Sequence, residues 1–131
     1  MEYLIDTQIV IWSIISPNKL SSNVREILQN HSIGVSQVSL YEIAIKQKIG
    51  KLPELNISIE NLVSRLLNDN FDILSIKNSH IDAYHSIPLM PDHKDPFDRL
   101  ILATTFSEDL PIISSDENFK LYIPQIQLIE N

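Results

Sequence analysis

The sequence has no cysteine and only two glycines, Gly34 and Gly50, among its 131 residues. Without cysteine the chain has no disulfide scaffold, no cysteine-ligated zinc or iron–sulfur cluster and no thiol nucleophile. Two glycines so far apart cannot build a P-loop or a GxGxxG dinucleotide-binding turn, since both motifs need several glycines within one short segment. Any metal would therefore be bound by oxygen or histidine ligands.

A basic N-terminal region and long apolar runs are also missing. The chain begins with acidic residues where a signal peptide carries basic ones, and the apolar stretch Ile9–Ile15 has no small-residue cleavage site after it. No apolar run approaches the roughly 18 residues that span a bilayer. We therefore expect a cytoplasmic protein with no membrane partner.

Positive charge is scarce, because 10 Lys and Arg stand against 17 Asp and Glu and give a formal net charge of −7. Taken as a whole, this charge predicts repulsion of nucleic acids and anionic membranes. The length and the 44% hydrophobic content are those of an ordinary globular domain, because a single core commonly takes about 100–200 residues. We expect residues 1–131 to form one domain.

Short apolar runs alternate with longer amphipathic stretches along the chain. The runs predict strands at Tyr3–Ile5, Ile33–Ser36, Phe71–Leu74, Pro111–Ile113 and Gln125–Ile129. The amphipathic stretches predict helices at Thr7–Ile15, Val24–Gln29, Ser39–Ile49, Ser58–Leu67, Ser79–Ser86, Pro96–Phe106 and Glu117–Leu121. This alternation favours crossover connections, so the expected fold class is α/β with a mainly parallel sheet.

Four acidic residues lie where such a sheet forms its ligand crevice, at the carboxyl ends of the strands. Asp6 directly follows the first predicted strand, and Asp116 follows the fourth. Glu42 and Asp98 lie in the first turns of predicted helices that leave the same edge. Clustered carboxylates suit hard cations such as Mg²⁺ or Mn²⁺, and without a cation they repel one another and raise their pKa values.

The same acids also have the positions of helix caps. Asp6 and Asp116 precede predicted helices, Asp95 precedes a helix with proline at its first position, and Ser39 with Glu42 has the spacing of a capping box. Capping explains each acid singly, but it does not require all of them to come from neighbouring corners of one sheet edge. From the pattern alone, capping and metal binding both remain open.

Four segments, in their order and spacing, resemble the PIN-domain family and in particular its VapC-type ribonuclease toxins. The segments are Leu4–Thr7, Val38–Lys46 with Gly50–Leu52 behind it, His93–Ala103 and Ser114–Asp116. The Asp-Pro-Phe-Asp-Arg stretch at 95–99 is the most specific of them. The resemblance covers essentially the whole chain and implies one PIN domain over residues 1–131, with a five-stranded, mainly parallel sheet flanked by helices on both faces.

The resemblance also implies a function, because Asp6, Glu42, Asp98 and Asp116 match the acidic quartet with which this family binds Mg²⁺ or Mn²⁺. It implies a metal-dependent endoribonuclease that is the toxin of a toxin–antitoxin pair, with RNA as substrate, a cognate antitoxin protein as partner and a homodimer as assembly. Further candidates at the site, each with a capping, turn or surface ion-pair role as its alternative, are Thr7, Asp95, Ser115 and Arg99.

Two other functions stay open at this point. One is a PIN-like binding module without catalysis, which would be expected to have lost one of the four acids, whereas all four are present. The other is a phosphatase that uses Asp6 as its nucleophile. The pattern of such phosphatases has a second aspartate two residues later, where this chain has Gln8.

The remaining signals give weaker predictions. His93 is expected to be exposed on a loop, and the histidines show no spacing typical of a zinc site. Lys46, Lys48 and Lys51 predict either a solvated helix end or a small patch that contacts phosphate. Trp12 and its apolar neighbours are expected to pack in the core, and the resemblance implies that some of them also take part in self-association and antitoxin binding.

Overall fold

The computed structural model describes all residues, 1–131, and contains one five-stranded sheet. Its strands are β1 (Tyr3–Ile5), β2 (Ile33–Ser36), β3 (Phe71–Leu74), β4 (Ile112–Ser114) and β5 (Leu128–Glu130). Their order is β3-β2-β1-β4-β5, and every neighbouring pair is parallel. The predicted α/β class and parallel sheet are confirmed.

The strand order changes direction between β1 and β4. From β1 the chain builds outward to β2 and β3, and it then returns to add β4 and β5 on the other side. In register, Ile5 of β1 lies beside Ile113 of β4, so the carboxyl ends of these two strands are neighbours. Such a switch point is where open α/β sheets bind their ligands.

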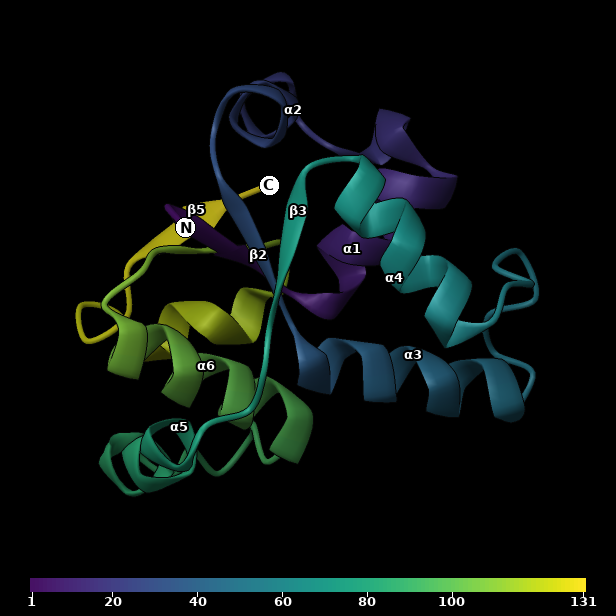
Figure 1. Ribbon diagram of the computed structural model, residues 1–131. Helices are drawn as coiled ribbons and strands as arrows, with labels where there is room; N and C mark the ends of the chain where they lie inside the picture. The colour runs from purple at the N-terminus through teal and green to yellow at the C-terminus, as the bar shows by residue number, and fades with distance from the viewer.

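Helices join the strands and cover both faces of the sheet. They are α1 (Thr7–Ile15), α2 (Ser22–Asn30), α3 (Gln37–Lys48), α4 (Ile59–Asn68), α5 (Asn78–Ala83) and α6 (Pro96–Glu108), with the 3-10 turns η1 (Pro17–Lys19), η2 (Tyr84–Ser86) and η3 (Glu117–Tyr122). Figure 1 shows α1 and α4 on one side of the sheet and α5 and α6 on the other. This confirms the predicted layers.

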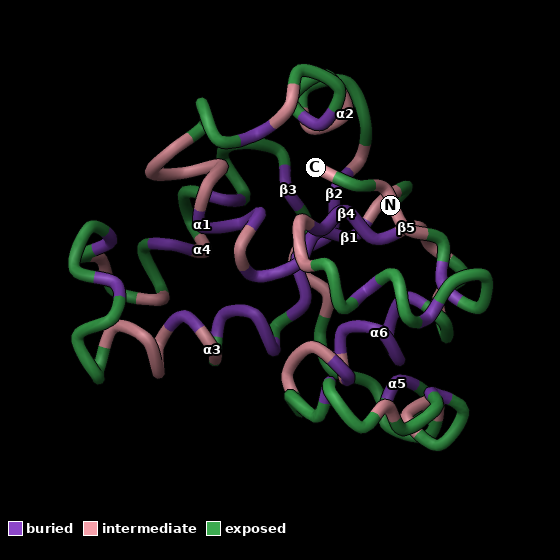
Figure 2. The backbone as a smooth tube through the Cα atoms, turned by 180° about the vertical axis from the view of Figure 1, so that it is seen from behind, coloured by how far each residue is buried: buried purple, intermediate pink, exposed green.

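Successive strand residues are buried on opposite faces. Ile5 and Ile113 belong to the core beneath α1 and α4, whereas Leu4 and Ile112 belong to the core beneath α6. The central strands are buried except for the half-buried Tyr3, while the peripheral α5 is mostly exposed (Figure 2). Because both faces are covered, the strands appear in the sequence as continuous apolar runs rather than as alternating ones.

The start of α3 differs from the sequence prediction by two residues, and its end, at Lys48, differs by one. The helix begins at Gln37, because the hydroxyl of Ser36 accepts a hydrogen bond from the N–H of Val38 (3.3 Å) and caps the helix. Ser39 lies inside the first turn, so the predicted capping box between Ser39 and Glu42 is wrong. Gly50, with a φ of 77°, follows the helix end as predicted.

Other boundaries differ by a few residues. The helix predicted over 79–86 is divided into α5 and η2, and α6 continues to Glu108, two residues further than predicted. β4 and β5 lie one to three residues later than the predicted strands. No helix combines the length and the apolar character that crossing a lipid bilayer requires.

Candidate active site

Asp6 lies at the switch point, directly after β1, and is the N-cap of α1. Its Oδ1 accepts a hydrogen bond from the N–H of Ile9 (2.9 Å), and its Oδ2 accepts one from the hydroxyl of Ser114 at the end of β4. The residue is only 5% exposed. Burial raises the pKa of the Asp6 carboxyl to about 6, and the charges of Asp98 and Asp116 act in the same direction, against the two hydrogen bonds.

The start of α6 brings a second carboxylate to this edge. Asp95 is the N-cap, and its Oδ1 accepts hydrogen bonds from the N–H groups of Phe97 (2.8 Å) and Asp98 (3.2 Å). Pro96 occupies the first helical position, where a missing N–H costs nothing. This cap fixes the first turn of α6, from which the side chain of Asp98 reaches the site.

Asp98 is partly buried and carries the second strongly shifted pKa. Its pKa is raised to about 6, chiefly by burial; the charges of Asp95, Asp116 and Glu42 act in the same direction, against a hydrogen bond with His93. That bond joins Asp98 Oδ2 to His93 Nε2 over 3.0 Å. Two acids at the same edge thus remain partly protonated just below neutral pH.

Glu42 reaches the site from the second turn of α3. The hydroxyl of Thr7 donates to Glu42 Oε1 (2.7 Å) and also lies 2.9 Å from Ser39 Oγ. The other carboxylate oxygen, Oε2, is 3.5 Å from the ammonium of Lys46, one helical turn further along. Both oxygens of Glu42 are therefore held by neighbouring side chains.

Asp116 extends from the turn between β4 and η3. Its Oδ1 accepts a hydrogen bond from the N–H of Asn118 (2.9 Å), and its own N–H donates to Ser114 Oγ (3.0 Å). Because Ser114 also donates to Asp6, one hydroxyl links the turns that follow β1 and β4. Sequence reasoning selected Ser115 and missed Ser114, although Ser114 is the last strand residue and lies beside the end of β1.

The predicted quartet lines a single cavity of about 290 Å³ that contains no apolar residue. The lining residues are Asp6, Thr7, Gln8, Glu42, Lys46, Asp95, Asp98, Ser115 and Asp116. Of the predicted site residues, only Arg99 lies elsewhere. Five carboxylates face one ammonium, so the cavity carries a strong local excess of negative charge.

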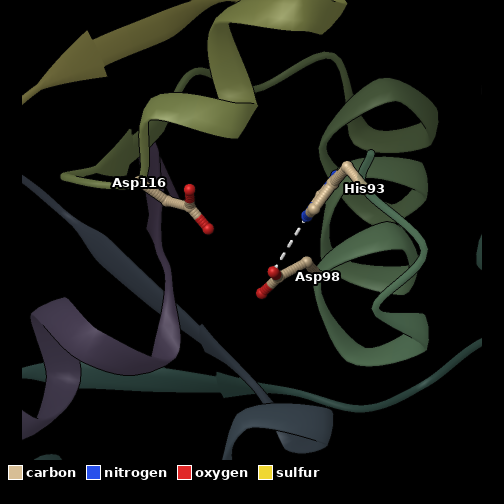
Figure 3. A group of neighbouring side chains, drawn as sticks. All are labelled: His93, Asp98 and Asp116. Carbon is tan, nitrogen blue, oxygen red and sulfur yellow. Dashed lines mark hydrogen bonds and ion pairs between the residues drawn. The ribbon is translucent and has the colours of Figure 1, made fainter. Parts of the chain in front are cut away.

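His93 is buried, so the prediction of an exposed loop histidine is wrong. It is 4% exposed, and its Nδ1 lies 2.8 Å from the hydroxyl of Tyr122. With Nδ1 accepting from that hydroxyl, Nε2–H donates to Asp98. A ring nitrogen of His93 and one carboxylate oxygen each of Asp98 and Asp116 lie within 4.8 Å of one another. Figure 3 shows the three side chains pointing toward a common space. This trio could also hold a metal ion.

Arg99 neither lines the cavity nor forms a surface ion pair, so both predictions for it are wrong. It is 1% exposed, and its guanidinium donates to the hydroxyls of Tyr84 (3.0 Å) and Tyr122 (3.3 Å) and to the carbonyls of Pro88 (2.8 Å) and Ile87 (3.1 Å). Neighbouring residues on a helix point roughly 100° apart, which turns Arg99 inward when its neighbour in the sequence faces the cavity. Arg99 therefore anchors the loop before α6.

The three lysines of the predicted patch do not act as one group. Lys46 lines the acidic cavity, whereas Lys48 is exposed and Lys51 lies in the loop after α3. Lys51 instead lines a neighbouring groove together with Lys46. A cation is therefore available at the rim of the cavity, but the patch predicted from the sequence is split.

Comparison with known proteins identifies a family and a fold. The family model described as "PIN domain" matches residues 3–122. No curated protein matches the chain by sequence.

Solved structures share the fold over almost the whole chain. VapBC2 from Rickettsia felis, bound to a DNA fragment from its promoter, has a TM-score of 0.68 at 18% identity and covers 99% of this chain and 98% of its own. DNA-bound VapBC from Salmonella typhimurium has a TM-score of 0.67 at 15% identity with the same coverage. A toxin–antitoxin complex from Klebsiella pneumoniae has a TM-score of 0.63 at 18% identity and covers 98% of this chain and 96% of its own.

Proposed function

Because the chain belongs to the PIN domain family, we propose that it is a metal-dependent endoribonuclease that hydrolyses RNA phosphodiester bonds. The observation that carries the proposal is the convergence of Asp6, Glu42, Asp98 and Asp116. They come from different elements, and all line one cavity without apolar residues at the switch point of the sheet. Capping alone would not require this convergence.

The donor set fits a hard divalent cation such as Mg²⁺ or Mn²⁺, since such ions prefer carboxylate oxygens. The raised pKa values of Asp6 and Asp98 reflect burial and acidic neighbours, whose effect exceeds that of the hydrogen bonds to these carboxyls. In the proposal these two residues are the principal ligands, and Glu42 and Asp116 bind directly or through water. A cation held there would polarise a water for in-line attack and offset charge on the phosphate and the leaving oxygen.

Hydrogen bonds within the chain hold the carboxylates of the proposed site in fixed orientations. Ser114 and the N–H of Ile9 fix the oxygens of Asp6, Thr7 fixes one oxygen of Glu42, and His93 fixes one oxygen of Asp98. Supporting contacts of this kind orient ligands before binding. In the proposal, Asp95 acts by fixing the start of α6, and Ser115 contributes a hydroxyl to the cavity wall.

We further propose that the protein is the toxin of a toxin–antitoxin pair. The likeness to a chain of a toxin–antitoxin complex from Klebsiella pneumoniae and to VapBC2 from Rickettsia felis supports this role. The proposal includes a cognate antitoxin that covers the cavity, a homodimeric toxin, RNA as substrate in the cytoplasm, and one PIN domain that spans residues 1–131.

The proposal is tested by incubating the purified protein with RNA and Mg²⁺ or Mn²⁺, with EDTA as the control. We expect endonucleolytic fragments that disappear with EDTA and in the Asp98→Asn variant. Asp82→Asn, which removes an exposed carboxylate on α5, is the matched control and should cleave normally. Cleavage by Asp98→Asn at the normal rate, with the fold intact, would remove Asp98 from the proposed mechanism.

The same assay separates the two alternative functions. A phosphatase would release phosphate from small phosphomonoesters and leave the RNA length unchanged. A binding module would retain RNA or a protein partner without shortening the RNA. Growth arrest on expression in a bacterial host, relieved by Asp98→Asn, tests the toxin role separately from the chemistry.

A further inference from the structure

A second groove of about 350 Å³ lies beside the acidic cavity and is termed the Trp12 groove. Its walls come from α1, η1, the end of α3 and the loop that follows α3, and the residues that matter below are Gln8, Trp12, Lys19, Lys46, Lys51 and Glu54. Gln8 and Lys46 line both cavities. The Trp12 groove therefore adjoins the proposed catalytic cavity, with Gln8 and Lys46 at their common border.

The charge of the Trp12 groove is opposite to that of the chain. Three of the chain's 10 Lys and Arg residues line it, against one acid, Glu54. Lys46 is partly neutralised by its contact with Glu42, whereas Lys19 and Lys51 are exposed. In a protein of net charge −7, this is a local concentration of positive charge next to an acidic cavity.

An aromatic side chain lies among these cations. Trp12 is half-buried, packs on the core beneath α1 with part of its side chain, and contributes to the groove wall. The ammonium of Lys19 lies 5.7 Å from the centre of the Trp12 ring system, within reach of a cation–π interaction. Aromatic faces beside lysines are what proteins use to bind single-stranded nucleic acid, since bases stack and phosphates pair.

We propose that the Trp12 groove binds the single-stranded RNA segment next to the scissile phosphate, with a base stacked on Trp12 and phosphates paired with Lys19 and Lys51. This inference depends on the proposed nuclease function, because it assigns a subsite for the same substrate. A phosphate in the acidic cavity must continue into flanking nucleotides. The adjoining Trp12 groove offers them positive charge and an aromatic face.

Trp12 is the only tryptophan, so its fluorescence reports on the groove without any labelling. We would titrate the protein in EDTA, where cleavage is not expected, with a short single-stranded RNA whose fluorescent end label gives binding independently by anisotropy. Tryptophan emission should be quenched with the same midpoint as the anisotropy change. Full binding by anisotropy without any change in Trp12 emission would overturn the proposal.

Charge variants test the phosphate contacts. Lys19→Gln and Lys51→Gln should each weaken RNA binding several-fold and lower the slope of log affinity against log salt concentration by about 0.7, the value for one phosphate contact on a single strand. Lys48→Gln removes an exposed lysine that lines neither cavity and should change neither quantity. Equal effects from all three variants would show that RNA affinity depends on the overall charge of the protein and not on the Trp12 groove, and would overturn the proposal.

Substitution of the ring tests the stacked base. Trp12→Leu should weaken RNA binding roughly 5- to 150-fold, the range for loss of one base–aromatic stack, whereas Trp12→Phe should recover part of it. Thermal unfolding identifies any variant that fails to fold, and the lysine variants keep the test decisive in that event. Equal affinities of the leucine and phenylalanine variants, both folded, would exclude stacking.

The outcomes separate this inference from the proposed function. If RNA is cleaved normally but does not change Trp12 emission, and Lys19→Gln binds RNA as wild type does, the nuclease function is supported and the RNA site in the Trp12 groove is contradicted. If RNA quenches Trp12 emission but is never cleaved with Mg²⁺ or Mn²⁺, the proposed nuclease function is contradicted and the Trp12 groove is supported as an RNA-binding site. Quenching by an acidic peptide and not by RNA would assign the groove to a protein partner instead.

Discussion

Replacing Asp6 by asparagine is expected to stabilise the metal-free protein at neutral pH. Asparagine keeps the shape of the side chain and can still accept the hydrogen bond from the N–H of Ile9, and it caps helices about as well as aspartate. The change removes one negative charge from a residue that is 5% exposed. A residue retained only as a helix cap would give no such gain, so the variant separates capping from a charged site.

The size of the gain follows from the pKa of Asp6. Its rise from 3.8 in the unfolded chain to about 6 in the folded protein corresponds to about 3 kcal/mol, since one pKa unit is worth about 1.4 kcal/mol. The folded state binds the proton of Asp6 more tightly than the unfolded chain does. The free energy of unfolding therefore falls as pH rises from about 4 to about 6, and it stays lower above pH 6. Asparagine resembles the protonated carboxyl, so a gain of about 1–3 kcal/mol is expected at pH 7.

The assay is urea denaturation in EDTA between pH 4 and pH 8. Wild type should lose stability across the lower half of this range, because both Asp6 and Asp98 have raised pKa values. The Asp6→Asn variant should show only the pH-dependent loss of stability that is due to Asp98. Asp82→Asn, at an exposed position, should have the same pH profile as wild type. A less stable Asp6→Asn protein at pH 7, or an unchanged pH profile, would refute the buried-charge argument and leave Asp6 as a cap.

Three further predictions concern the metal, the loop before α6 and the sheet. Mn²⁺ affinity, measured by titration calorimetry, should fall about 100-fold from pH 7.5 to pH 5. The reason is that the carboxyls of Asp6 and Asp98, with pKa values of about 6, must lose their protons to bind the ion. A pH-independent affinity would contradict metal binding by both carboxyls. Arg99→Leu should lower the free energy of unfolding in urea by about 2–4 kcal/mol, because the buried carbonyl of Ile87 and the part-buried carbonyl of Pro88 lose their donors. A loss below about 1 kcal/mol would show that other donors replace the guanidinium. Gly34→Ala should lower the free energy of unfolding by about 1–3 kcal/mol, measured by thermal unfolding, since a Cβ would lie 2.9 Å from the buried Leu4 Cδ2. An unchanged melting temperature would mean that β1 shifts freely to make room.

The sequence predicts most of the fold because its signals are local and agree with one another. A parallel sheet buried on both faces leaves continuous apolar runs. The N-cap Ser58 and the first-position Pro96 mark where α4 and α6 begin. The convergence of the acids is also predictable, since parallel strands end at one edge. Asp6 and Asp116 therefore fall together once their strands are recognised.

The contacts of His93 and Arg99 could not be predicted in the same way. The segment before α6 contains Pro88 and Pro91 and is followed by Pro96, a pattern typical of an exposed loop. Its burial is decided by Tyr122, which is 29 residues from His93 in the sequence and provides a hydroxyl to both side chains. No periodicity within the segment carries that information.

The start of α3 shows a different limit, because two serines compete for one cap. Ser36 and Ser39 both have the chemistry of an N-cap, and the helical pattern alone does not choose between them. The choice is made by the sheet, since β2 ends at Ser36 and the chain turns directly into the helix there. Ser39 is consequently fully buried beside Thr7, where it supports the contact to Glu42 instead of capping.

The net charge of −7 is not the charge that an RNA strand would meet. Five of the 17 acids line the acidic cavity, and the remaining 12 acids nearly balance the 10 Lys and Arg, which leaves −2 for the rest of the chain. The repulsion is thus concentrated at the place where a divalent cation would offset it. Three lysines line the adjoining Trp12 groove. RNA affinity should therefore depend on bound metal and on this groove far more than on the overall charge of the protein.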